Sequence, residues 1–243
     1  MRGTWTSEDV GGKAADVYEP VDRPRFGVLH LHGADLQTLR DRPAFTRLFD
    51  ELRLACVCPH GDYSWWGDRI WPAFDPHVTP ERYLLDQALP FFERRWGFKP
   101  RSVGLQGVSM GGQGALRLAF KHPDLFPVVA AICPALDYHE LYGRGFSVDQ
   151  MYDSKEQCRQ DTALLHVPPY NAPPHLYFAI DTDHRWYRGC DRLHEKMSAL
   201  GVAHTFMLSS EGGGHTWEDF SRMAKSALDF LAGGLDQESR RLL

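Results

Sequence analysis

The serine in the segment GVSMG, Ser109, has the strongest claim to chemistry in this sequence. Gly107-Val108-Ser109-Met110-Gly111 fits the pattern G-x-S-x-G, with an apolar alternating stretch before it and an amphipathic helical pattern after it. A sharp strand-to-helix turn leaves no room for Cβ atoms on either side of the serine, a condition that glycine meets. The pattern therefore predicts a nucleophile at the start of a helix, where N–H groups favour an oxyanion. The alternative is a glycine-rich turn with an inert serine.

Ser109 needs a general base, because a serine hydroxyl is a poor nucleophile until its proton is removed. His215, in the segment EGGGHTWEDF, is the best candidate among the 12 histidines. It follows the last expected strand, and the glycines at 212–214 let a loop carry its ring toward the serine. We predict Asp183 as the acid that orients His215, with Asp181 as the alternative, because both follow the strand-like run HLYFAI and precede the histidine in the chain.

An oxyanion hole is expected to need two backbone donors. One is the N–H of Met110, the residue after the nucleophile. The second should come from the loop after an early strand, where the sequence LHLHGAD places Gly33 and Ala34. We predict that the N–H of Gly33 or Ala34 acts together with that of Met110.

The same segment allows a competing interpretation as a metal site. His30 and His32 form an H-x-H pair whose rings share one face of a strand, and Asp35 would be a third ligand. Hydrolytic sites of that kind normally add an acidic residue and a histidine directly afterwards, whereas Gly33 and Ala34 follow here. We therefore predict neither a metal nor another cofactor.

Aromatic residues are concentrated in loops expected at the catalytic edge of the sheet. We predict that Trp65, Trp66 and Trp186 bind substrate, because such rings stack against sugars or aromatic acyl groups. Trp217 belongs to the apolar stripe of the last helix and is expected in the core. The alternative for each ring is ordinary packing within a loop.

Short apolar runs alternate with helical patterns along the chain. This alternation predicts one α/β domain, residues 1–243, with a mostly parallel sheet, helices on both faces and ligands at the carboxyl ends of the strands. A helix opening at Thr79 should kink at Pro90, and the last helix should start at a Thr216–Asp219 capping box and end at Gly233-Gly234. The expected strands are 26–32, 54–59, 102–106, 128–136, 175–181 and 204–208.

Composition restricts the partners. A net charge of −5 gives no electrostatic basis for binding nucleic acid, and no apolar run is long enough to span a membrane. The N-terminal segment lacks an apolar signal-peptide core, which favours a cytoplasmic location. The five cysteines are odd in number and scattered, so we expect reduced thiols, with Cys56 and Cys58 in the core.

Three segments together resemble the α/β-hydrolase superfamily. They are FGVLHLHGAD, GLQGVSMGGQGALRLAFKHPDLFPVVAAICPALD and HLYFAIDTDHRWYRGCDRLHEKMSALGV with GGGHTWEDF. The chain is most similar to its esterase branch, which includes esterase D (S-formylglutathione hydrolase), feruloyl and acetylxylan esterases and mycolyltransferase-like proteins. The similarity spans residues 16–231 and implies a Ser–His–Asp triad, hydrolysis of carboxylic esters and no large cap domain. Where the family commonly has Gly-x-x-Asp, this chain has DTDH, so a strict column match puts His184 at the acid position.

The sequence thus predicts a serine hydrolase that cleaves a small-molecule ester through an acyl-enzyme. Two alternatives stay open. One is a binding protein that keeps the α/β-hydrolase fold without catalysis, and the other is an acyltransferase or peptidase with the same triad. The oligomeric state is not predicted.

Overall fold

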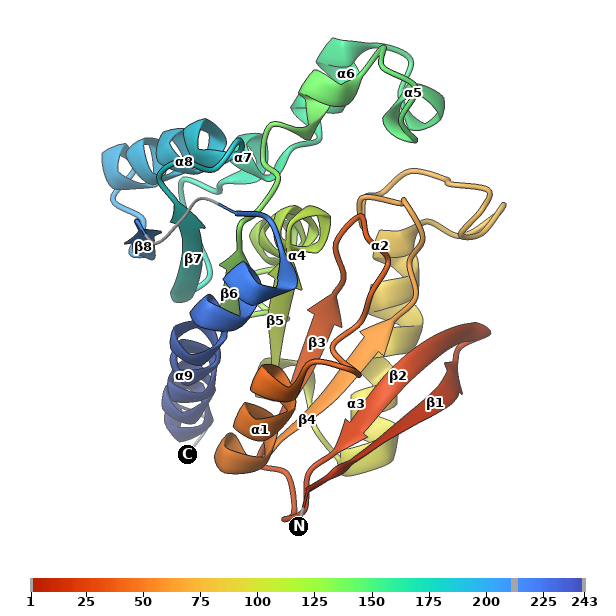
Figure 1. Cartoon of the computed structure of the whole chain (residues 1–243), viewed down its shortest axis with the longest axis vertical. Coiled ribbons are helices and arrows are strands. Elements are labelled where there is room, and N and C mark those ends of the chain that lie inside the picture. The colour runs from red at the N-terminus through yellow and green to blue at the C-terminus, as the bar shows by residue number, and fades with distance from the viewer. Residues whose placement is uncertain (1, 211–213, 242–243) are drawn as a thin grey trace.

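One eight-stranded sheet organises the chain. The computed structural model describes residues 2–210 and 214–241. Figure 1 shows the strands side by side in the order β1-β2-β4-β3-β5-β6-β7-β8. Their bounds are β1 Thr4–Val10, β2 Lys13–Glu19, β3 Phe26–Leu31, β4 Leu54–Pro59, β5 Val103–Val108, β6 Val128–Ile132, β7 His175–Asp181 and β8 Thr205–Ser209.

The sheet is parallel from β4 through β8, as the sequence predicts. Strands β3, β4, β5 and β6 are buried at every position, which is typical of parallel strands covered on both faces. The antiparallel β1–β2 hairpin was not predicted. Its signal is Gly11-Gly12, both at positive φ, between two alternating stretches.

Helices cover both faces of the sheet, with α1 and α9 packed together in front of it in Figure 1 and α3 behind it. The α-helices are α1 Pro43–Leu52, α2 Pro80–Tyr83, α3 Leu89–Trp96, α4 Met110–Lys121, α5 Val148–Met151, α6 Lys155–Gln160, α7 Ala163–His166, α8 Tyr187–Ala199 and α9 Trp217–Arg241. Three further helical turns are 3-10 or π: η1 Leu84–Ala88, η2 Pro100–Ser102 and η3 Tyr138–Leu141. No helix among the described residues has the length and apolarity to cross a membrane.

The helix that opens at Thr79 is interrupted before Pro90, as expected. The interruption takes the form of the π-helical turn η1, which joins α2 to α3. A proline ring clashes with the carbonyl four residues earlier in a regular α-helix, and the wider π turn relieves that clash. Gly97 ends α3 with φ of 74°.

Helix α9 starts at the predicted capping box, in which the Asp219 carboxylate accepts from the Thr216 N–H at 2.9 Å. The prediction that Gly233-Gly234 ends this helix is wrong, because α9 continues to Arg241. A Cβ atom on Gly234 would lie 2.9 Å from Val128 Cγ1, so this glycine lets the helix approach β6 closely. Gly233 faces open space.

The chain between β6 and β7 forms the short helices η3, α5, α6 and α7. Helices α5 and α6 lie beyond the carboxyl ends of the strands in Figure 1, above the sheet. This segment is a small cover and not a large cap domain, in agreement with the prediction.

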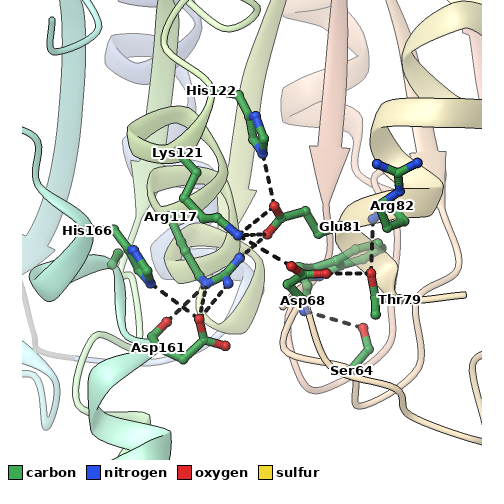
Figure 2. Close-up of polar contacts among 12 residues, drawn as sticks. Ser64, Asp68, Thr79, Glu81, Arg82, Arg117, Lys121, His122, Asp161 and His166 are labelled. Atoms are coloured by element: carbon green, nitrogen blue, oxygen red, sulfur yellow. Dashed lines mark hydrogen bonds and ion pairs between the residues drawn. The ribbon is translucent and has the colours of Figure 1, made fainter.

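A buried arginine ties this cover to helix α4. Arg117 on α4 is 2% exposed and pairs with Glu81 on α2 and with Asp161, whose Oδ1 lies 2.5 Å from its Nη2 (Figure 2). Burial raises the pKa of Glu81, but hydrogen bonds from His122 and Lys121 and the charge of Arg117 outweigh it and hold this pKa well below its usual value.

We expect Arg117→Met to lower the free energy of unfolding by about 3 kcal/mol, because the buried Glu81 and the partly buried Asp161 each lose a buried cationic partner. Urea denaturation followed by circular dichroism measures the change. The matched control is Arg159→Met, which removes an exposed pair with Glu156 and should cost less than about 1 kcal/mol. Equal losses in the two variants would contradict the role given to Arg117.

Candidate active site

Ser109 occupies a strained turn between β5 and α4. Its φ of 54° and ψ of −117° lie outside the regions that non-glycine residues normally adopt. A Cβ atom on Gly107 would lie 2.2 Å from the carbonyl oxygen of Gly111, and one on Gly111 would lie 1.9 Å from that of Leu31. Both flanking glycines are therefore required by the close approach of helix, strand and turn.

His215 lies next to the serine, as the sequence predicts. Its Nε2 is 2.8 Å from Ser109 Oγ. Of the three glycines expected to shape its loop, Gly212 and Gly213 lie outside the described residues. Gly214 is described, and a Cβ atom there would lie 2.1 Å from a carboxylate oxygen of Asp219. Gly214 thus fits tightly against the start of α9.

The other nitrogen of His215 contacts a second histidine, which corrects the assignment of Asp183. His215 Nδ1 lies 2.7 Å from Nε2 of His184. The other ring nitrogen of His184, Nδ1, accepts a hydrogen bond from the backbone N–H of Trp186 at 3.0 Å. Asp183 is exposed, and its backbone N–H donates to Asp181 Oδ1 at 3.0 Å. The turn after β7 directs residue 184 inward and residue 183 outward, so the histidine takes the place expected for the acid.

Burial and charge keep His215 neutral over most of the pH range. Burial lowers its pKa most, the neighbouring His184 and Arg185 lower it further, and Asp219 opposes them, with a net value of about 4. Burial also lowers the pKa of His184. Both rings are therefore uncharged at neutral pH.

The loop after β3 lies against the serine. A Cβ atom on Gly33 would lie 3.3 Å from Ser109 Cβ. The Gly33 carbonyl accepts from His32 Nδ1 at 2.8 Å and from the Leu36 N–H at 3.1 Å. The N–H of Ala34 lies on the opposite side of the same planar trans peptide and points away from these two donors.

His30 and His32 are engaged within the core. His32 Nε2 accepts the Gly61 N–H at 2.9 Å, so both of its nitrogens are in use, and His30 Nδ1 pairs with Gln106. Burial lowers the pKa of His30 to about 3 and that of His32 to about 4. Within the described part of the chain, no three His, Cys, Asp or Glu side chains are grouped to hold a metal ion. All five cysteines are buried and free.

A cavity of about 570 Å³ opens onto Ser109. Trp65 and Trp186 line it, with Ala34, Tyr63, Trp71, Leu141, Phe146 and Arg185. Trp66 does not: it is fully buried, its Nε1 donates to the His32 carbonyl at 3.1 Å, and its Cβ packs on Gly114. The structure therefore corrects the prediction that Trp66 binds substrate.

Comparison with known proteins identifies the family. The family model described as "Putative esterase" matches residues 75–225, more than half of the chain. The chain belongs to this family. Membership of this esterase family supports carboxylic ester hydrolase activity, and the α/β-hydrolase fold agrees with that assignment. A search of curated protein sequences found no match.

Solved structures share the fold at low sequence identity. An S-formylglutathione hydrolase from Agrobacterium tumefaciens is 16% identical with a TM-score of 0.78, covering 96% of this chain and 94% of its own. A ferulic acid esterase gives the same identity and TM-score over 96% and 100% of the two chains. A fluorophosphonate-binding serine hydrolase F from Staphylococcus aureus is 18% identical with a TM-score of 0.74, over 96% and 99%.

His184 is the site residue that reasoning from residue types missed. An acid was sought because a carboxylate normally orients the base, and two aspartates stood at the right strand end. The sequence did contain a signal: when DTDH is aligned with the family's Gly-x-x-Asp, His184 matches the aspartate that serves as the acid.

We expect Gly111→Ala to destabilise the fold by about 3 kcal/mol, because the added methyl group would overlap the carbonyl of Leu31 on a central strand. Thermal and urea unfolding measure the loss. The matched control is Gly233→Ala, an exposed helical glycine facing open space, which should gain up to about 1 kcal/mol. A stable Gly111→Ala protein would contradict the steric account of the turn.

Proposed function

We propose that this protein is a serine esterase that works through an acyl-enzyme, with Ser109 as nucleophile and His215 as general base. The observation that carries the proposal is the 2.8 Å contact between Ser109 Oγ and His215 Nε2 at the wall of a cavity. The strained turn at Ser109 supports it, since such strain is concentrated at functional sites.

In the proposed reaction, Ser109 Oγ attacks the ester carbonyl carbon and its proton passes to His215 Nε2. The tetrahedral intermediate collapses, the C–O bond to the alcohol breaks, and His215 returns the proton to the leaving alkoxide. A water then attacks the acyl carbon, again giving a proton to His215. The bond between the acyl carbon and Ser109 Oγ then breaks, His215 returns its proton to that oxygen, and the acid is released.

The proposed oxyanion hole combines the N–H groups of Met110 and Ala34. Met110 is the first residue of α4, so its N–H has no acceptor within the helix. Ala34 is favoured over Gly33, because the bonds to the Gly33 carbonyl turn the Ala34 N–H toward the other side of the peptide. Ala34 also lines the cavity beside Ser109.

The proposed substrate is a small ester with an apolar or aromatic group. The cavity is lined mainly by aromatic rings, and Trp65 is held in place by stacking on Tyr138 with ring centroids 4.5 Å apart. Arg185 lies over the Trp186 ring at 5.0 Å and adds a positive charge at the cavity wall.

We expect Ser109→Ala to abolish fluorophosphonate labelling and hydrolysis of p-nitrophenyl acetate, because the proposed acyl-enzyme forms only on this oxygen. Gel-based labelling and release of p-nitrophenolate measure the two effects. The matched control is Ser198→Ala, an exposed serine on α8, which should behave as wild type. Labelling that persists without Ser109 would refute the assignment of the nucleophile.

We expect the labelling rate to stay level from pH 8 to about pH 5 and to fall below about pH 4. His215 accepts a proton only when neutral, and its pKa of about 4 keeps it neutral above that value. The groups facing it are His184, Arg185, Asp219 and Ser109. Rates measured across the pH range, with circular dichroism to confirm folding, test this, and a decline centred near pH 6.5 would contradict it.

A further inference from the structure

Four polar groups form one continuous chain that ends at the nucleophile. The backbone N–H of Trp186 lies 3.0 Å from His184 Nδ1, His184 Nε2 lies 2.7 Å from His215 Nδ1, and His215 Nε2 lies 2.8 Å from Ser109 Oγ. The first member is a peptide N–H, which can only donate. The two imidazoles are neutral, and a neutral imidazole carries one N–H and one acceptor nitrogen.

These facts determine where the protons lie. Because Trp186 donates to His184 Nδ1, that nitrogen is the acceptor and the proton of His184 is on Nε2. His184 Nε2–H then donates to His215 Nδ1, which must be the acceptor of its own ring. The proton of His215 is therefore on Nε2, and Nε2–H donates to Ser109 Oγ.

This is the opposite arrangement to the one that general-base catalysis needs. To remove the hydroxyl proton of Ser109, His215 must present an unprotonated Nε2 and hold its proton on Nδ1. A carboxylate enforces that form, because it only accepts hydrogen bonds. A neutral histidine held by a backbone N–H enforces the other form.

We propose that His184 is a positioning residue that restrains the active site by holding His215 in the non-productive tautomer. This inference rests on the proposed roles of Ser109 and His215. Turnover then proceeds from a minor form, in which His184 has moved its proton to Nδ1 and given up the hydrogen bond from Trp186.

The surrounding charges add to the restraint. When His215 takes up the serine proton it becomes a cation, and the positive charge of the neighbouring Arg185 disfavours that form. The Asp219 carboxylate is attractive, but it accepts hydrogen bonds from Thr216 and pairs with Arg222. Asp183 is exposed on the far side of the turn.

The test is the pair of variants His184→Asp and His184→Asn. An aspartate there would accept both the Trp186 N–H, two residues on, and an Nδ1–H of His215. An asparagine of the same shape would accept from Trp186 through its oxygen and donate its NH₂ to His215 Nδ1, as His184 does. We expect kcat for p-nitrophenyl acetate to be about 10²–10⁴-fold higher in His184→Asp than in His184→Asn, since the wrong tautomer costs about 10⁴ in a triad.

The pH dependence of kcat shows whether residue 184 acts on the protonation of His215 or only on the packing around it. The new carboxylate should raise the pKa of His215, so His184→Asp should gain an acid limb near pH 6–7 that His184→Asn lacks. Equal kcat values for the two variants, with Ser109-dependent turnover in wild type, would overturn the inference and leave the proposed function standing. A gain that survives Ser109→Ala in the His184→Asp background would instead refute the proposed function.

A direct readout decides the point even if turnover is undetectable. In wild-type protein labelled with ¹⁵N-histidine, long-range proton–nitrogen NMR distinguishes the two tautomers of His215, with His215→Gln assigning its signals. We expect a protonated Nε2 and an unprotonated Nδ1. A protonated Nδ1 with a bare Nε2 would overturn the inference.

Discussion

The close approach of α4 to the carboxyl edge of the sheet is the constraint on which the site depends. The carbonyl of Leu31 and the backbone of Gly111 leave no space for a methyl group between them. Beside this contact Ser109 adopts a positive φ and lies at the wall of the cavity. The contact also sets the position of the helix that carries Arg117, so one steric fit governs both the nucleophile and its support.

The buried ion pairs of Arg117 connect helix α4 to the segments that form the walls of the cavity. Arg117 joins α4 to Glu81 in α2, the first part of the interrupted helix, and to Asp161 in the segment between β6 and β7 (Figure 2). That segment also supplies Leu141 and Phe146 to the cavity. The cover over the site is therefore anchored to the nucleophile helix and not only to neighbouring loops, although its helices are short.

The parts of the molecule that local pattern determines were predictable. The parallel strands are continuous apolar runs because both faces are covered, and the turn at Ser109 is specified by glycines within two residues of it. The extent of α9 was not predictable, since Gly234 serves a contact with Val128 that is remote in sequence. The partner of His215 was missed for a related reason. Which of residues 181, 183 and 184 faces inward depends on the path of a turn, and residue type alone favoured an aspartate.

The contact between the two imidazoles also has a genetic consequence. Histidine codons differ from aspartate codons at one base, the first, and from asparagine codons at the same base. The site restrained by His184 and a site assisted by an aspartate at the same position thus differ by one base. The fold, the cavity and the nucleophile are the same in both. A single point mutation is enough to carry the chain from one to the other.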